Sequence, residues 1–194
     1  MKGRLKWAVG VAVLAAAAAV GTVAVAGDGK QIREDLIGYQ EVPAISTTGN
    51  GTFKARIDRN GQQISYRLTY ADLEGDVTQA HIHIGQRAVN GAIVAFLCSN
   101  LPNPPAGTPA CPPAPGTVEG TIEPADVRDT TTATPPVGGQ GIEAGAFDEL
   151  VDAIKAGVTY ANVHSTKWPG GEIRAQLEGD DNGDQGDDAR DDDD

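Results

Sequence analysis

The sequence is poor in sulfur, and this scarcity excludes one class of metal site. Its only methionine is Met1, and its two cysteines are Cys98 and Cys111. Soft copper(I) and blue-copper centres use cysteine or methionine sulfur as ligands. Met1 belongs to a segment that we expect to be removed, and a disulfide would leave no thiolate. Such a centre would therefore lack its usual ligands.

Several motifs that carry chemistry are also missing. The chain has no Gly-x-Ser-x-Gly turn to expose a serine nucleophile, no glycine-rich phosphate loop and no His-Glu-x-x-His zinc motif. It has 27 acidic and 15 basic residues, a formal net charge of −12, which argues against nucleic acid as a partner. The sequence therefore favours a binding protein over an enzyme, although these absences leave turnover open.

Residues 1–26 are typical of a secretory signal peptide. Lys2, Arg4 and Lys6 precede an uncharged run from Trp7 to Ala26, which ends in the small-x-small pattern of a cleavage site. An uncleaved membrane anchor is the alternative, because an apolar run of about 20 residues can span a bilayer. We expect cleavage and a secreted or cell-envelope protein, which would touch a membrane only through an uncleaved signal.

The opposite end of the sequence is strongly acidic. Residues 179–194 contain nine aspartates and a single basic residue, Arg190. Like charges at this density repel one another and bury no apolar surface, so we expect a disordered acidic tail. With residues 27–35 as a lead-in, residues 36–178 remain as one folded domain with its own core.

The two cysteines of this domain are close in sequence. In an exported protein, such a pair is most simply a disulfide between Cys98 and Cys111. The segment that it would close is rich in proline, asparagine and glycine, and closing it should stabilise the fold by about 3 kcal/mol. A reactive or metal-binding thiol is the alternative.

The remaining pattern is one of short strands. Glycine (25) and proline (12) are plentiful and aromatics are sparse, which suits strands joined by turns. Residues 53–57 and 64–70 alternate between apolar and polar on either side of an Asn-Gly turn, which predicts a hairpin. Further strands are expected at 77–84, 92–97, 117–123, 158–164 and 171–177, the last two paired as a hairpin.

One strand and one helix have more specific features. The run 92–97 is apolar throughout, so we expect it to be central in its sheet. Residues 147–154 carry one apolar stripe at helical spacing, and Gly157 is placed to end that helix in a left-handed conformation. The sequence predicts an all-β, mainly antiparallel β-sandwich or barrel-like domain with one short amphipathic helix.

All three histidines lie in two of these predicted strands. His81 and His83 are two residues apart, so both side chains point to the same face of their strand, and His164 shares a face with Asn162. Glu172 and Arg174 form a polar row on the last strand. If these strands are neighbours, the six side chains form one polar cluster.

Such a cluster could bind a metal. Imidazoles two residues apart on a strand can converge on one ion, and with His164 they would form a three-nitrogen site for Cu²⁺ or Zn²⁺. Water or a carboxylate such as Glu172 would complete the coordination. Two alternatives stay open: a hydrogen-bonded structural cluster of these polar side chains, or unrelated positions on a solvent-facing surface.

Three stretches of the sequence resemble the chordin-type (CHRD) domain family. They are "LIGYQEVPAISTTGNGTF" (36–53), "AHIHIGQRAVNGAIVAFL" (80–97) and "YANVHSTKWPGGEIRAQL" (160–177). The resemblance implies an extracellular all-β module of the kind found in animal chordin and in exported bacterial proteins. Ala88 departs from the family pattern, in which glycine is common at this position after the histidine strand.

We weigh three functions. The first is a secreted or cell-envelope binding module, without turnover, for an extracellular ligand that the sequence does not identify. The second is a mononuclear copper or zinc protein that uses His81, His83 and His164, with redox activity as an open question. The third is a structural or adhesive envelope protein.

Overall fold

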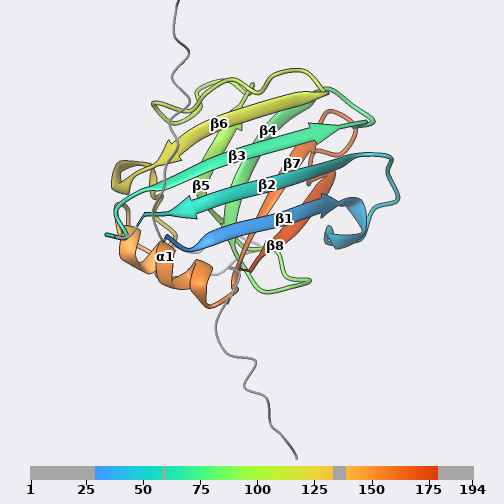
Figure 1. Cartoon of the computed structure of the whole chain (residues 1–194). Helices are drawn as coiled ribbons and strands as arrows, with labels where there is room; N and C mark the ends of the chain where they lie inside the picture. Colours follow the sequence, from blue (N-terminus) through green and yellow to red (C-terminus); the bar gives the residue numbers. More distant parts are fainter. Residues whose placement is uncertain (1–28, 59, 133–138, 179–194) are drawn as a thin grey trace, which may run out of the picture.

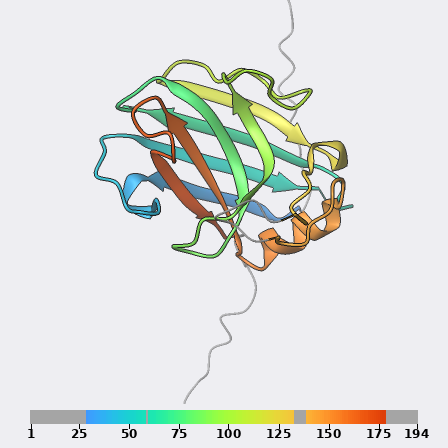
Figure 2. The same cartoon turned by 180° about the vertical axis from the view of Figure 1, so that it is seen from behind.

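The computed structural model describes residues 29–58, 60–132 and 139–178. The predicted signal peptide and the predicted disordered acidic tail lie outside these residues. Eight strands form one sheet in the order β5-β4-β7-β8-β1-β2-β3-β6, and every neighbouring pair is antiparallel. The sheet curls into a nearly closed barrel, with β1, β2, β3 and β6 in front and β4, β5, β7 and β8 behind (Figures 1 and 2). The predicted fold class is confirmed.

The eight strands are short and are numbered in the order in which they follow one another in the sequence. Their bounds are β1 Gln31–Ile37, β2 Asn50–Ile57, β3 Ile64–Ala71, β4 Val77–Ile84, β5 Ala92–Ser99, β6 Gly116–Ile122, β7 Thr159–Ser165 and β8 Ile173–Leu177. Two short 3-10 turns are η1 (Gly38–Gln40) and η2 (Pro124–Asp126), and the α-helix is α1 (Phe147–Lys155).

The predicted hairpin is formed by β2 and β3, which pair from Ile57 opposite Ile64 to Asn50 opposite Ala71. Asp58 stabilises the turn, because its carboxylate accepts the backbone N–H of Gln62 at 2.7 Å. On both strands the apolar set is buried and the alternate residues face outward, as the period of two requires. The front strands therefore have one face in the core and one face in solvent.

The position predicted for the apolar run at 92–97 was wrong. It forms part of β5, but β5 lies at one end of the strand order rather than in its centre. Loop backbone covers its outer edge: Val94 O accepts the N–H of Arg128 at 2.9 Å, and Ser99 N–H donates to Pro109 O at 2.9 Å. These contacts bury an end strand, so an apolar sequence did not require a central one.

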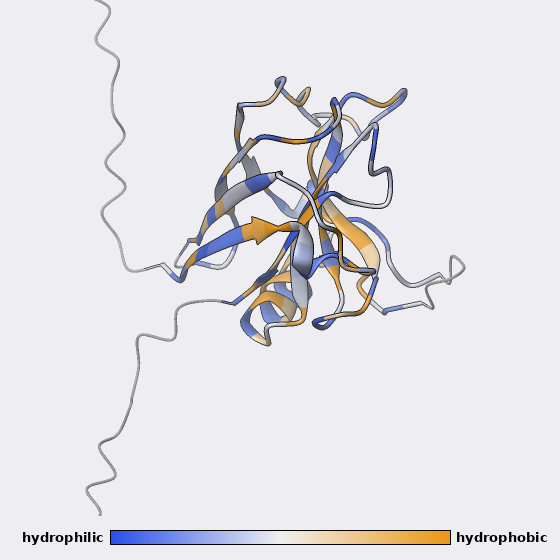
Figure 3. Cartoon of the chain, turned by 90° about the vertical axis from the view of Figure 1, so that its right-hand side faces the viewer, coloured by the Kyte–Doolittle hydropathy of each residue, from blue (hydrophilic) through white to orange (hydrophobic). Residues whose placement is uncertain are grey.

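The helix is as predicted. α1 buries Phe147, Leu150, Val151 and Ile154, and Gly157 follows it with a φ of 67°. Figure 3 shows hydrophobic and hydrophilic residues side by side on the helix and on the strands above it. The part of the chain that the structure describes contains no helix of bilayer-spanning length and hydropathy.

The back of the barrel differs from the front because both faces of its strands are covered. Every residue of β7 and β8 is buried. Their inner face supplies apolar side chains to the core, including Val163 and Ile173. Their outer face carries polar side chains, and loop residues from 41–44 and 86–91 pack over it. We call this covered polar face of β4, β7 and β8 the polar layer.

The loop after β4 has one constrained position. Ala88 has a φ of 59°, in the left-handed region that glycine adopts most readily. A glycine at this position would fit this backbone without strain. The loop adopts this conformation with alanine. Two of its carbonyl oxygens, Gln86 O and Val89 O, accept hydrogen bonds from the Arg174 guanidinium.

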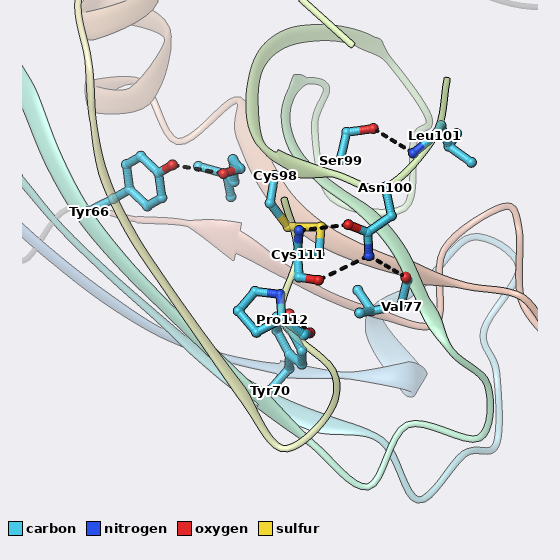
Figure 4. Close-up of a disulfide and its surroundings, with 10 residues drawn as sticks. Tyr66, Tyr70, Val77, Cys98, Ser99, Asn100, Leu101, Cys111 and Pro112 are labelled. Carbon is cyan, nitrogen blue, oxygen red and sulfur yellow. Dashed lines mark hydrogen bonds between the residues drawn. A yellow bond between two sulfur atoms is a disulfide. The ribbon is translucent and has the colours of Figure 1, made fainter. Parts of the chain in front are cut away.

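The predicted disulfide is present between Cys98 and Cys111 (Figure 4). The disulfide closes the loop that follows β5. Tyr70 on β3 holds this loop against β3, because its hydroxyl donates to Pro112 O at 2.5 Å. Asn100 adds three hydrogen bonds inside the same loop region, two from its amide NH₂ to Val77 O and Cys111 O and one accepted from Cys111 N.

The first and last strands lie side by side. β8 pairs with β1, and the backbone N–H of Glu178, just after β8, donates to the Glu34 carboxylate on β1 at 3.3 Å. Both ends of the described domain therefore leave from the same edge of the barrel (Figure 1).

Candidate metal centre

The polar layer brings the three histidines together. His81 and His83 come from β4 and His164 comes from β7, the neighbouring strand. One ring nitrogen of each lies within 4.8 Å of the others, and the His81 ring centroid lies 5.0 Å from that of His164 and 5.4 Å from that of His83. Two nitrogens bound to one tetrahedral ion lie about 3.3 Å apart. A small contraction of the site would therefore allow all three to bind one ion.

Two of the rings are held by backbone carbonyl groups. His83 Nδ1 lies 2.9 Å from Gly91 O, and His164 Nδ1 lies 2.9 Å from Pro169 O. A carbonyl oxygen only accepts, so each Nδ1 carries the hydrogen and each Nε2 presents its lone pair. This is how histidines that bind metals are usually oriented.

The other ring nitrogens of His81 and His83 are not held by hydrogen bonds among the described residues. His83 Nε2 and both ring nitrogens of His81 are buried and have no hydrogen-bond partner among the described residues. A buried polar group without a partner destabilises a fold by about 1–3 kcal/mol. The cluster is thus only partly satisfied by the protein itself.

The surroundings keep all three imidazoles neutral. Burial, together with smaller effects of the neighbouring His164 and His83, lowers the pKa of His81 to about 2. Burial also lowers the pKa of His83 to about 4, and it lowers the pKa of His164. Neutral imidazole is the form that binds a metal, so these ligands need no deprotonation at neutral pH.

Asn162 adds an oxygen to the same group of atoms. It lies opposite His81 on the neighbouring strand, and its Oδ1 is 3.1 Å from His164 Nε2. With Nδ1 protonated, His164 Nε2 and Asn162 Oδ1 both present lone pairs, an arrangement that a shared cation would stabilise. Asn162 is therefore placed as a fourth ligand.

A stack of three planar groups supports His83 from the side. The Tyr160 ring lies 4.7 Å from the His83 ring at an interplanar angle of 4°, and the guanidinium carbon of Arg174, on β8, lies 3.4 Å from the Tyr160 ring centroid. Arg174 donates to Gln86 O and Val89 O, so its charge is held by carbonyl groups of the covering loop. Arg174 therefore belongs to the predicted cluster, but the Tyr160 ring lies between its guanidinium group and the His83 ring.

A comparison with known protein families identifies this domain. The model of the CHRD domain family matches residues 32–177. The chain belongs to the CHRD domain family. No curated protein and no solved structure matches the chain. CHRD domains are typically extracellular, and the family is one of binding modules.

In this CHRD domain, Glu172 points to a different set of groups. Its Oε1 accepts the Thr47 hydroxyl and the backbone N–H of Glu74, each at 2.7 Å. Glu172 lies in a bend before β8 begins, so its side chain need not follow the alternation of that strand. The carboxylate expected to complete the site is engaged elsewhere.

Glu41, by contrast, is a site residue that the sequence patterns did not single out. It is buried beside Asn162 and Arg174, and its Oε1 has no hydrogen-bond partner among the described residues. Burial raises the pKa of Glu41 to about 7, although Arg174 opposes the shift. The only sequence signal for it was its place in the family string "QEVP".

Gly171 leaves room for this carboxyl group. A Cβ at this position would lie 2.3 Å from Glu41 Oε1 and 2.9 Å from Asn162 Nδ2, and its backbone has a φ of 123°. Both the contact and the conformation therefore require glycine.

The donor set of this CHRD domain defines its chemistry. It offers three neutral imidazole nitrogens and one amide oxygen, with no thiolate, because both cysteines are in the disulfide. Such borderline nitrogen ligands suit Zn²⁺ and Cu²⁺. His83 and His164 are 8% and 6% exposed, so the site lies just beneath the surface.

Proposed function

We propose that this CHRD domain is an extracytoplasmic module that binds one Cu²⁺ or Zn²⁺ ion with His81, His83 and His164. The observation that carries the proposal is the orientation of the rings. Two are anchored through Nδ1 to backbone carbonyls, and one ring nitrogen of each histidine lies within 4.8 Å of the others. Asn162 Oδ1 supplies an additional oxygen ligand.

A hydrogen-bonded structural cluster accounts for less of this geometry. In such a cluster the ring nitrogens would bond to one another or to neighbouring polar groups. His81 instead makes only ring contacts, with Phe96, His83 and His164, and neither of its nitrogens has a partner in the described structure. A bound cation would be coordinated by the ring-nitrogen lone pairs that have no hydrogen-bond partner among the described residues.

The family and the pattern of residues 1–26 support the proposed location. CHRD domains are typically extracellular, and residues 1–26 have the pattern of a cleaved signal. The disulfide suits an oxidising compartment. Mass spectrometry of the exported protein tests this part, because cleavage after Ala26 would leave a chain that begins at Gly27.

Calorimetry and thermal unfolding test the metal site. The wild type, His81→Ala, His83→Ala and His164→Ala are titrated with Zn²⁺ and with Cu²⁺, and each melting temperature is measured with and without metal. We expect submicromolar binding and a metal-dependent rise in the wild type, and loss of both in each variant. The Cu²⁺ complex should show nitrogen hyperfine splitting by electron paramagnetic resonance.

Thr159→Val is the matched control. Thr159 lies on β7 with His164, is fully buried, and its Oγ1 has no hydrogen-bond partner among the described residues. This variant should keep the wild-type metal affinity. Absence of binding by a folded wild type, with each histidine variant only less stable, would leave the structural cluster as the explanation.

A further inference from the structure

The front of the barrel carries basic side chains in one line. Arg33 on β1 lies opposite Lys54 on β2, and Lys54 lies opposite Arg67 on β3. All three side chains are exposed on the outer face. Like charges directly opposite one another on neighbouring strands repel. We call Arg33, Lys54 and Arg67 the basic row.

The outer face places two carboxylates beside this row: Asp35 on β1, which accepts the Thr52 hydroxyl at 2.9 Å, and Glu119 on β6. Arg67 forms an ion pair with Glu119 at one end. Neither Arg33 nor Lys54 makes an ion pair with any residue that the structure describes. This arrangement occurs in a chain whose formal net charge is −12.

The three side chains of the basic row line a small hollow. The hollow has a volume of about 100 Å³ and is lined by Arg33, Thr52, Lys54, Arg67 and Thr69. Guanidinium and ammonium groups around a space of this size suit a carboxylate or another small oxyanion.

We propose that the acidic tail, residues 179–194, docks on the basic row, with its aspartate carboxylates at the hollow. The tail has nine aspartates, and it begins directly after Glu178, whose backbone N–H contacts Glu34 on β1. β1 also carries Arg33. A segment of this length can extend to about 50 Å, whereas the row spans two strand spacings, about 10 Å.

Docking would make the tail a tethered competitor for other anions. A segment tethered close to its site has an effective concentration on the order of millimolar there. External polyanions would reach the basic row only by displacing it. The interaction is electrostatic and exposed, so it weakens as salt shortens the Debye length.

Paramagnetic relaxation enhancement tests the contact in the full chain. A nitroxide attached at Ala189→Cys keeps every aspartate of the tail, and the native disulfide stays intact. We expect broadening of the backbone amides of Arg33, Lys54 and Arg67, and none in the polar layer. The broadening should disappear in about 1 M salt, where the Debye length is about 3 Å.

Charge variants provide the control. The triple variant Arg33→Gln, Lys54→Gln, Arg67→Gln should lose the broadening. A triple variant of exposed cations elsewhere, Arg128→Gln, Lys155→Gln and Lys167→Gln, should keep it. Broadening that persists without the basic row, or that spreads evenly over the domain, would overturn the proposal.

Competition gives a second readout. A synthetic peptide of nine aspartates is titrated into the wild type and into a full chain whose tail aspartates are changed to asparagine. We expect roughly tenfold or more tighter binding to the neutral-tail chain, because the tethered tail competes in the wild type. Equal affinity for both chains would mean that the basic row binds external anions and the tail does not occupy it.

Discussion

At the scale of residues, the domain keeps several polar atoms buried without partners. Both nitrogens of His81, Oε1 of Glu41 and Oε2 of Glu172 have no hydrogen-bond partner among the described residues. Each such group costs about 1–3 kcal/mol. The histidines and Glu41 lie together in the polar layer, so this local instability is concentrated where the proposed ion would bind.

The same residues predict how stability depends on pH in the metal-free protein. Burial lowers the pKa of all three histidines in the folded state, to about 2 for His81 and about 4 for His83, so between pH 4.5 and 6.5 His81 and His83 take up protons mainly on unfolding. The pKa of Glu41 is raised from 4.5 to about 7, so the folded protein alone holds its proton in that range. Unfolding between pH 4.5 and 6.5 should then take up at least about one proton, two at His81 and His83 less one from Glu41, and His164 adds to this uptake because its pKa is also lowered.

The free energy of unfolding should therefore fall by at least about 1 kcal/mol per pH unit as the pH is lowered through this window, and by more with the contribution of His164. Urea unfolding at several pH values measures the slope. Glu41→Gln should make it steeper by about one proton, because the opposing group is removed. A flat profile in both proteins would show that the histidines titrate normally in the fold.

At the scale of elements, the β4–β5 connection holds the site together. The backbone of Gly91 contacts two site residues, because its carbonyl accepts His83 Nδ1 and its N–H donates to the Tyr160 hydroxyl at 3.2 Å. A Cβ on Gly91 would lie 1.6 Å from Ile84 O. Only glycine allows the chain to pass this close to the end of β4.

Gly91→Ala should therefore destabilise the protein by about 2–4 kcal/mol and weaken metal binding, because the anchor of His83 must move. Gly170→Ala is the control, since a Cβ there has open space and an ordinary backbone conformation. Denaturant unfolding and metal titration of both variants provide the comparison. Equal stability of the two variants would contradict this account of Gly91.

Elements that depend on local periodicity were predictable from the sequence. Alternation gave the β2–β3 hairpin and placed His81 and His83 on one face, and helical spacing gave α1. The end position of β5 was not predictable, because an apolar run reports burial and carries no information on strand order. The approach of Glu41 to Asn162 joins two distant parts of the chain, and the bend at Glu172 interrupts the alternation on which its placement depended.

At the scale of the whole molecule, the barrel has one seam, between β5 and β6, which are the two ends of the strand order. Groups from β3 cross to the β5 side: the Tyr66 hydroxyl donates to Leu97 O at 2.8 Å, and Tyr70 binds the loop closed by the disulfide (Figure 4). The covalent link and these hydrogen bonds take the place of the missing strand pairing.

Removing the disulfide should reduce stability without removing the metal site. We expect Cys98→Ala with Cys111→Ala to lower the free energy of unfolding by about 3 kcal/mol, because the unfolded chain gains freedom. Tyr70→Phe, which removes one hydrogen bond from the same loop, should cost about 1 kcal/mol. Urea unfolding measures both losses. A double variant as stable as the wild type would show that the hydrogen bonds alone close the seam.

The neighbouring positions of β1 and β8 make this domain a candidate for circular permutation. A short linker from Glu178 back to Lys30 would join its natural ends, and the chain could be reopened at the Asn60–Gly61 turn without cutting a strand. For the same reason, the whole domain could be inserted into a single surface loop of a host protein. Its histidine-bearing strands would then be displayed on a new scaffold with their pairing unchanged.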